Sequence, residues 1–533
     1  MLEKDQGKIF STPNAPRYVI IFLLIFYCLT NFSHRNWTND EGPIRGVIKW
    51  DVISYYAYLP AVFIYHDLCL DFTENPDFVN DNKFWYQKTE KGKKVIITSM
   101  GLSYLYAPFF FAAHVIAPVF NEPRDGFQSV YQFFLVFSAL FYVGIGFYFL
   151  WKLLARYFPA GVSAITLLLI GMGTNLYYYS THEAAMSHAY NFSLIALFLY
   201  LLSRWFDAAG WKNSLLLGLV YGLVVLIRPT NFLLIILLLL WEVDSWETLM
   251  ERMRFLVRKI PLILFMVGGF LIPWIPQLLY WKDVSGSFFY NSYSEVGSAF
   301  YFDNSHLLDF LFSYRKGWFV YTPLMLFAVF GFYPLYWMRR GQFYGTLIYF
   351  VFMIYIFSSW WSWWTGGSFG IRSMVDLMGV FSLPLAAFIT WLGTHGRKLK
   401  VGISLLLVFT VFLNIFQTWQ YQEGLIHGTG MTRQSYWTVF LRSADRYGYW
   451  QNLTNPDFEL ARRGIYVYHP IILDPELWKG LSEEDAKFII VKEISWDKRL
   501  NKDIRRYCKR TGAGKQETLD MVADRIYQKR VSN

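Results

Sequence analysis

The chain has 533 residues, of which 55% are hydrophobic, 21% aromatic and only 17% charged. That composition is too apolar for an ordinary water-soluble protein of this length, and it indicates a protein that crosses a membrane several times. The net charge of +10 does not indicate a nucleic-acid partner, because lysine and arginine occur in short clusters between hydrophobic runs. Clusters in that position orient membrane spans.

The first hydrophobic run covers residues 18–33, and no small-residue cleavage site follows it. It therefore predicts a retained first span and not a removed signal peptide. Ten further runs are predicted to cross the membrane, for which a helix needs about 20 apolar residues, or fewer where flanking residues reach the interface. These runs lie at about residues 127–150, 160–178, 187–203, 214–227, 230–241, 260–281, 317–338, 344–360, 373–392 and 400–419.

Basic residues fall in alternate short loops between these runs. They are Lys152 and Arg156, Arg204 and Lys212, Arg252 to Lys259, Arg339 and Arg340, and Arg397 to Lys400. Loops rich in lysine and arginine stay on the cytoplasmic side. The pattern predicts eleven spans, a cytoplasmic N-terminus and a C-terminus on the outer face.

The predicted first outer loop covers about residues 34–126 and contains one further apolar stretch, Gly101 to Phe120. Counting that stretch as a span would move every later basic loop to the outer face, so we expect a juxtamembrane helix at the outer surface. From residue 421 to residue 533 charged residues become frequent and hydrophobic runs shorten. The predicted fold class is an all-α polytopic membrane protein, with a transmembrane domain over residues 1–420 and a small outer-face region over 421–533.

Asp51 lies in the segment WDVISYYAYLP, directly after Trp50 and before several tyrosines. In partly desolvated aromatic surroundings a carboxylate is suited to general-base catalysis, and aromatic faces such as those of Tyr55 and Tyr56 suit sugar rings. The other interpretation is an interfacial helix with a capping aspartate and an aromatic belt.

Arg228 begins the segment RPTN between two runs that are short for full spans. The segment predicts a hairpin of half-length helices over residues 214–241 that turns inside protein or a water-filled cavity, because lipid cannot satisfy exposed backbone groups. An arginine at such a depth needs a cavity, a partner or a phosphate. A bound phosphate and an ion pair between two helices both remain open.

Arg372 follows the segment TGGSFG on another predicted outer loop, and Lys316 precedes a span in RKGW. Glycines let the backbone approach a ligand, and a guanidinium suits a lipid-linked phosphate. The alternative is an ion pair between Arg372 and Asp376, four residues later. GxxxxGK spacing is absent, so no P-loop for a soluble nucleotide is predicted.

The outer loop HEAAMSH contains His182, Glu183 and His188. The spacing is not HExxH, so these residues are predicted to contact an acceptor or line a cavity and not to bind a metal. No CxxC or metal-ligand spacing occurs among the three cysteines, Cys28, Cys69 and Cys508.

Over about residues 15–420 the chain resembles the membrane glycosyltransferases of the GT-C superfamily, which contains protein O-mannosyltransferases and the aminoarabinose transferase of lipid A. The resemblance lies in the many spans, the acid of WDVISYYAYLP, the RPTN turn, KGWFVYTPL and WWTGGSFGIRSMVD. In that family the donor is a sugar on a polyprenyl phosphate. A first-loop acid serves as base or positions the acceptor, and basic residues of later outer loops hold the phosphate.

The resemblance implies that Asp51 is the catalytic base and that Arg372, Arg228 and Lys316 hold the donor phosphate. Many members carry adjacent Asp and Glu near the first span, which leaves Asp40 and Glu41 as alternative acids. It implies an inverting displacement at the periplasmic face of a bacterial inner membrane, with a protein, lipid or glycan acceptor. Some members use a divalent metal, but the first loop has no clear acidic cluster beyond these three acids, and we predict no cofactor.

Two other functions remain open. A lipid-linked glycan ligase or polymerase would depend on His182 or His188 instead of Asp51. A transporter would also contain an intramembrane arginine and broken helices. Against transport, the polar groups concentrate on one predicted face and no pair of matching halves is evident.

Overall fold

The computed structural model describes residues 12–38, 46–80, 83–294, 297–445, 448–467 and 481–531. The chain divides into two compact units. The first consists of Met1–Val296, Tyr321–Met353 and Arg372–Thr418. The second consists of Gly297–Val320, Ile354–Ile371 and Trp419–Asn533, and so combines the C-terminal region with two upstream segments.

Helices dominate the first unit. In chain order they are α1 (Ala15–His34), α2 (Asp51–Phe63), α3 (Gly101–Ile116), α4 (Ser129–Leu154), α5 (Ala160–Gly173), α6 (Leu176–Thr181), α7 (Ser187–Asp207), α8 (Trp211–Ile227), α9 (Ile235–Leu240), α10 (Trp246–Arg258), α11 (Ile260–Leu271), α12 (Trp274–Ser285), α15 (Met325–Phe330), α16 (Phe332–Met338), α17 (Arg340–Ser358), α18 (Met378–Gly393) and α19 (Arg397–Gln422). Helices α17 and α19 each continue for a few residues into the second unit.

Short 3-10 helices and one hairpin complete the first unit. The 3-10 helices are η2 (Asn36–Thr38), η3 (Asp71–Glu74), η4 (Ala117–Phe120), η5 (Pro229–Leu234) and η8 (Arg372–Leu377). The hairpin pairs β1 (Tyr86–Lys88) with β2 (Lys94–Ile96) in antiparallel register, with Gln87 opposite Val95.

The fold is that of an all-α polytopic membrane protein. By length and composition, seven helices of the described residues are suited to cross a membrane, or eight if α11 and α12, which bend by 51°, form one span. The seven are Ala15–Thr38, Gly101–Phe120, Ser129–Leu154, Ser187–Asp207, Arg340–Ser358, Arg372–Gly393 and Arg397–Gln422. Six of the eleven predicted runs correspond to these helices, one corresponds to the bent pair, and four correspond to shorter apolar helices.

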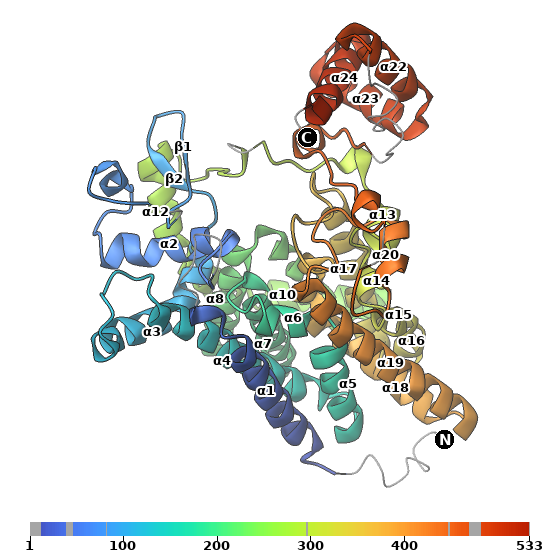
Figure 1. Cartoon of the computed structure of the whole chain (residues 1–533). Helices are drawn as coiled ribbons and strands as arrows, with labels where there is room; N and C mark the ends of the chain where they lie inside the picture. Colours follow the sequence, from blue (N-terminus) through green and yellow to red (C-terminus); the bar gives the residue numbers. More distant parts are fainter. Residues whose placement is uncertain are drawn as a thin grey trace. The chain divides into compact units, whose positions relative to one another are not determined.

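Gly101–Phe120 is also long and apolar enough for a span, although it was predicted to lie along the membrane surface. In Figure 1, α2 and α3 run across the direction of α1 and are not parallel to it. That orientation fits a surface helix, and the surface position stays a prediction.

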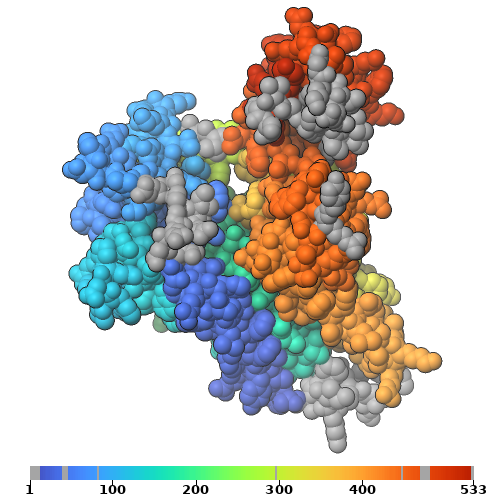
Figure 2. Space-filling model, in the orientation of Figure 1, coloured from blue at the N-terminus to red at the C-terminus, as the bar shows by residue number. Residues whose placement is uncertain are grey.

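Helices α1 and α19 lie at the edge of the first unit, where only 22% of the apolar window of each is buried. Large apolar side chains point outward from them, among them Phe22 and Ile25 on α1 and Leu405 and Val408 on α19. Figure 2 shows α1, in dark blue, on the surface of the molecule. Helices with apolar side chains pointing outward along their length are suited to lipid contact.

The centre of the first unit is formed by α7 and by η8 with α18, whose apolar windows are 72% and 89% buried. Helices that are apolar on all sides are buried among other helices. Because α7 and η8 pack against each other, polar side chains at their ends are brought together inside the protein.

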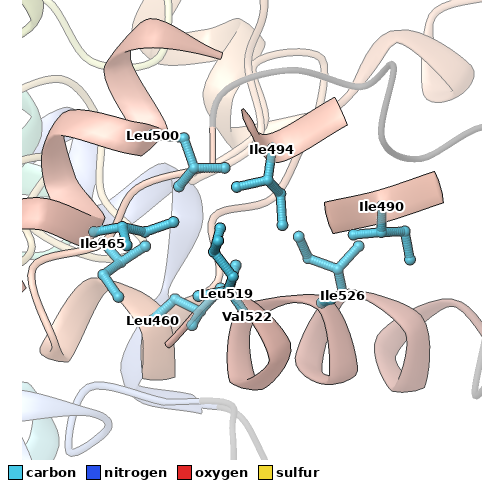
Figure 3. Packing of buried hydrophobic residues seen from close by; sticks show 10 residues of the cluster. Leu460, Ile465, Ile490, Ile494, Leu500, Leu519, Val522 and Ile526 are labelled. Carbon is cyan, nitrogen blue, oxygen red and sulfur yellow. The ribbon is translucent and has the colours of Figure 1, made fainter. Parts of the chain in front are cut away.

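The second unit carries the remaining helices. They are η7 (Phe302–Asn304), α13 (Leu307–Phe312), α14 (Trp318–Tyr321), α20 (Arg433–Val439), η9 (Trp450–Asn452), α21 (Phe458–Arg462), α22 (Glu483–Trp496), α23 (Lys498–Thr511) and α24 (Lys515–Val531). The last three form a small bundle around a core that includes Ile490, Leu500 and Val522 (Figure 3).

Candidate functional site

Asp51 and Arg372 form an ion pair, although 321 positions separate them in the sequence. Asp51 Oδ2 lies 2.9 Å from an Arg372 guanidinium nitrogen, and the side chains are 39% and 20% exposed respectively. We call these two residues the surface pair. Because both remain partly exposed, an incoming ligand has access to the carboxylate and the guanidinium together.

Local backbone geometry presents Asp51 at the first position of α2. The preceding residue, Trp50, has a φ of 51°, which is rare for a bulky side chain and marks a strained position. An acidic residue in the first helical turn is favoured by the positive end of the helix dipole. The strained residue and the helix start together fix where the carboxylate lies.

A second set of polar residues lies near the surface pair, and all of its members except Arg228 are fully buried. His188 Nδ1 lies 2.7 Å from Asp376 Oδ1, and neither side chain has any exposed surface. Asn191 donates to Asp376 Oδ2 at 3.0 Å, and the Arg228 Nε lies 3.5 Å from the same oxygen. We call His188, Asn191, Arg228 and Asp376 the buried network.

The contacts of His188 show which of its two ring nitrogens carries the proton. Arg228 reaches His188 Nε2 at 3.4 Å, and a guanidinium only donates hydrogen bonds, so Nε2 must accept. The proton of a neutral imidazole then lies on Nδ1 and is donated to Asp376. One carboxylate therefore compensates the single positive charge of Arg228, as a buried charge requires.

Arg228 reaches the buried network because the chain leaves the helix there. Helix α8 ends at Ile227, Arg228 is extended with φ −143° and ψ 108°, and η5 begins at Pro229. A residue before proline is forced away from the helical conformation. The predicted break at RPTN is confirmed, and it turns the guanidinium toward α7.

Two further titratable residues lie close to the surface pair: Tyr55, which is also close to Arg228 of the buried network, and Glu183. The Tyr55 hydroxyl lies next to Ser187 and close to the charges of Arg228 and Asp51. Burial raises the pKa of Tyr55, so it stays a neutral donor. Burial also raises the pKa of Glu183, while the nearby charges of Lys49 and Arg372 act in the opposite direction.

His182 is 7% exposed and its ring lies 4.4 Å from the ring of His34. Burial, helped by the neighbouring imidazole, lowers the pKa of His182 to about 3. Its Nδ1 lies 2.8 Å from the Thr181 hydroxyl, and its ring stacks on Tyr178. His182 is thus a neutral, packed residue and does not join the surface pair or the buried network.

The structure does not bring every predicted site residue to this place. Tyr56 points to a different side of α2 from Tyr55, where its hydroxyl donates to the carbonyl of Gly126. Lys316 belongs to the second unit, where its ammonium group contacts the carbonyl and hydroxyl of Ser368. Asp40 and Glu41 lie outside the described residues.

The described residues contain no group of three or more His, Cys, Asp or Glu side chains arranged to hold a metal ion. The acids near Arg372 face cations instead. Asp51 pairs with Arg372 and Asp376 with His188 and Arg228, which suits anion binding and proton transfer.

Sequence reasoning did not assign Asp376 and Asn191 to the site. It considered Asp376 only as an ion-pair partner of Arg372, but Arg372 pairs with Asp51 in the structure while Asp376 faces α7. Asn191 offered a signal, because it lies three residues after His188 and so on the same helix face.

Comparison with known proteins gives little independent guidance. No family model matches the chain, and no curated protein matches it. Among solved structures it is similar to the oligosaccharyltransferase of Archaeoglobus fulgidus in its apo form, with 13% sequence identity and a TM-score of 0.42. That match covers 80% of this chain and 58% of the other. Because identity and TM-score are both low, the function proposed below is derived from the site itself.

Proposed function

We propose that this membrane protein is a glycosyltransferase that moves a sugar from a polyprenyl-phosphate donor to an acceptor hydroxyl at the outer face of the membrane. The observation that carries the proposal is the surface pair. It places a carboxylate and a guanidinium 2.9 Å apart, both partly exposed. Such a reaction needs a base for the acceptor and a cation for the donor phosphate.

Donor binding would rearrange the surface pair. A phosphate oxygen competes with Asp51 for the Arg372 guanidinium, which binds phosphate in a bidentate manner. The carboxylate is then left facing the acceptor hydroxyl. Arg228, at 18% exposure, would supply a second positive charge to the same phosphate.

The reaction is a single displacement. Asp51 removes the acceptor proton while the acceptor oxygen attacks the anomeric carbon, and the bond from that carbon to the phosphate oxygen breaks. The leaving polyprenyl phosphate carries more negative charge than the donor did. Fixed cations therefore stabilise the transition state more than the ground state, which is the requirement for catalysis. Tyr55 and Glu183, which are near this point, would contact the sugar or the acceptor.

The positions of the histidines favour this reaction over a histidine-dependent ligase or polymerase. His188 is fully buried and donates its proton to Asp376, while His182 is packed and neutral. Neither side chain offers the exposed base that an acceptor would need.

The test is sugar transfer by the purified chain from a panel of polyprenyl-phosphate sugars, comparing wild type with Asp51→Asn and Arg372→Ala. We expect Asp51→Asn to slow transfer by about 10²-fold to 10⁴-fold and Arg372→Ala by about 10²-fold to 10³-fold. Asp283→Asn is the control, because Asp283 also forms an exposed ion pair, with Lys93 at 3.0 Å.

Equal transfer by wild type and folded Asp51→Asn would exclude Asp51 as the base and direct the test to Asp40 and Glu41. No transfer from any donor would reject the glycosyltransferase and favour transport. Transfer that survives in Asp51→Asn but is lost in His188→Gln would favour the ligase.

A further inference from the structure

The middle helix of the C-terminal bundle in the second unit has an unusual distribution of charge. Helix α23 carries Lys498, Lys502, Arg505 and Lys509 at spacings of four, three and four residues, so the four side chains share one face of the helix. All four are exposed, and none of them forms an ion pair within the described parts of the chain. We call these four residues the basic stripe.

The other faces of α23 contact the rest of the second unit. Leu500 and Ile504 point into the core of the small bundle. A third face binds the rest of the second unit: Arg499 lies 3.5 Å from Asp309, and Arg510 lies 3.0 Å from Asp303. The neighbouring cations of α23 form ion pairs with acidic residues, whereas the four residues of the basic stripe form none among the described residues. The basic stripe is therefore an uncompensated positive surface.

Helix α22 adds an apolar component directly before the basic stripe. Phe488 and Trp496 are 70% and 67% exposed, and Lys492 lies between them with its ammonium group 5.4 Å from the Trp496 ring. Positions separated by four residues share a helix face. We call Phe488, Lys492 and Trp496 the aromatic face. Its last member, Trp496, lies two positions before the first cation of the basic stripe.

We propose that the basic stripe and the aromatic face together form a binding surface for anionic lipid headgroups of the bilayer that holds this chain's own spans. Cations on a helix surface attract acidic lipids, and exposed Trp and Phe side chains insert at the level of the headgroups. The second unit continues directly from α19 at Trp419, so the chain itself tethers this surface to the membrane spans. A tethered surface binds at high effective concentration, so weak contacts suffice. This inference does not depend on the proposed function.

The experiment uses the full chain in nanodiscs of phosphatidylcholine, alone or mixed with phosphatidylglycerol, and measures hydrogen exchange over residues 481–511. We expect slower exchange of α22 and α23 in the anionic discs, by about fivefold for each cation engaged. The protection should fall when salt is raised from about 0.1 M to about 1 M, which shortens the screening length from about 10 Å to about 3 Å.

Three double variants separate lipid binding from other causes. Lys502→Gln with Arg505→Gln should remove the lipid dependence, whereas the control, Arg433→Gln with Lys515→Gln, should keep it, because Arg433 and Lys515 are exposed cations of the same unit outside the basic stripe. Phe488→Ser with Trp496→Ser should weaken protection in the anionic discs.

Equal exchange in both kinds of disc, or protection that persists in Lys502→Gln with Arg505→Gln, would overturn the proposal. A soluble polyanion that produces the same protection in phosphatidylcholine discs would replace the lipid by an anionic polymer as the partner.

Discussion

Two arginine–aspartate contacts lie near each other in the first unit but differ in burial. Asp51 is 39% exposed, whereas Asp376 has no exposed surface. Exposed ion pairs contribute about 0–1 kcal/mol to stability, while breaking a buried pair costs about 3–5 kcal/mol because the remaining charge is left uncompensated. The exposed pair of Asp51 and Arg372 is therefore expected to contribute little to stability, and the buried carboxylate of Asp376 is expected to contribute much more.

We predict that Asp376→Asn lowers the free energy of unfolding by about 3 kcal/mol, since it leaves the Arg228 charge without a buried counterion. Asp51→Asn should change it by less than about 1 kcal/mol. Denaturant unfolding of both variants in one detergent measures the difference. A loss of stability in Asp51→Asn equal to that in Asp376→Asn would show that the surface pair is structural.

His182 should make stability depend on pH. Its pKa is about 3 in the folded protein, below about 6.5 for an unperturbed histidine, so the unfolded chain binds a proton first as the pH falls. Stability is then complete above about pH 6.5 and decreases toward pH 3. At pH 5 the loss is about 2 kcal/mol.

We therefore predict that the decrease in unfolding free energy between pH 7 and pH 5 is about 2 kcal/mol smaller in His182→Gln than in wild type. Unfolding curves at the two pH values measure it, with His66→Gln as the control because His66 is an exposed histidine. An unchanged decrease in His182→Gln would mean that His182 is not held neutral by burial.

At the scale of elements, the packing of α8 against α11 positions Arg228, which directly follows α8. Gly218 and Gly222 of α8 lie against the backbone carbonyls of Met266 and Phe270, and Gly269 of α11 lies against that of Leu215. A Cβ at any of these three glycines would collide with backbone. Small residues four apart are a common means for membrane helices to approach closely.

We predict that Gly269→Ala lowers thermal stability and also reduces sugar transfer, because α8 must move and carry Arg228 with it. Gly268→Ala is a matched control on the next residue of α11, where an added Cβ meets nothing within 4 Å. Melting temperature and transfer rate are measured for both variants. Equal behaviour of the two would mean that the close approach of α8 and α11 does not position Arg228.

For the whole molecule, the positive-inside pattern predicts that the loop before α19 is cytoplasmic and that the hairpin of β1 and β2 is on the outer face. In a variant without native cysteines, a cysteine at Glu90 should react with a membrane-impermeant thiol reagent in intact cells. A cysteine at Lys398 should react only after the membrane is opened. Glu90 and Lys398 are both exposed, so reversed labelling would invert the predicted topology.

Sequence alone determined the class of the protein and the positions of its apolar helices. Hydropathy depends on local composition, so eleven apolar runs were located, and all of them correspond to helices or to a bent helix pair. The break at RPTN also followed from local chemistry, because proline restricts the residue before it. Asp51, Tyr55 and Arg372 were selected as residues able to carry chemistry, and the structure brings them together.

Tertiary structure decided which of those residues meet. Arg372 pairs with a residue of α2 and not with Asp376 four positions away. Tyr56 and His182 are packed away from the surface pair, and Asp376 became the centre of the buried network. The strength of an ion pair depends on the distance between its charges and on the water around them. Both quantities are set by how distant segments pack, which no local pattern of residues specifies.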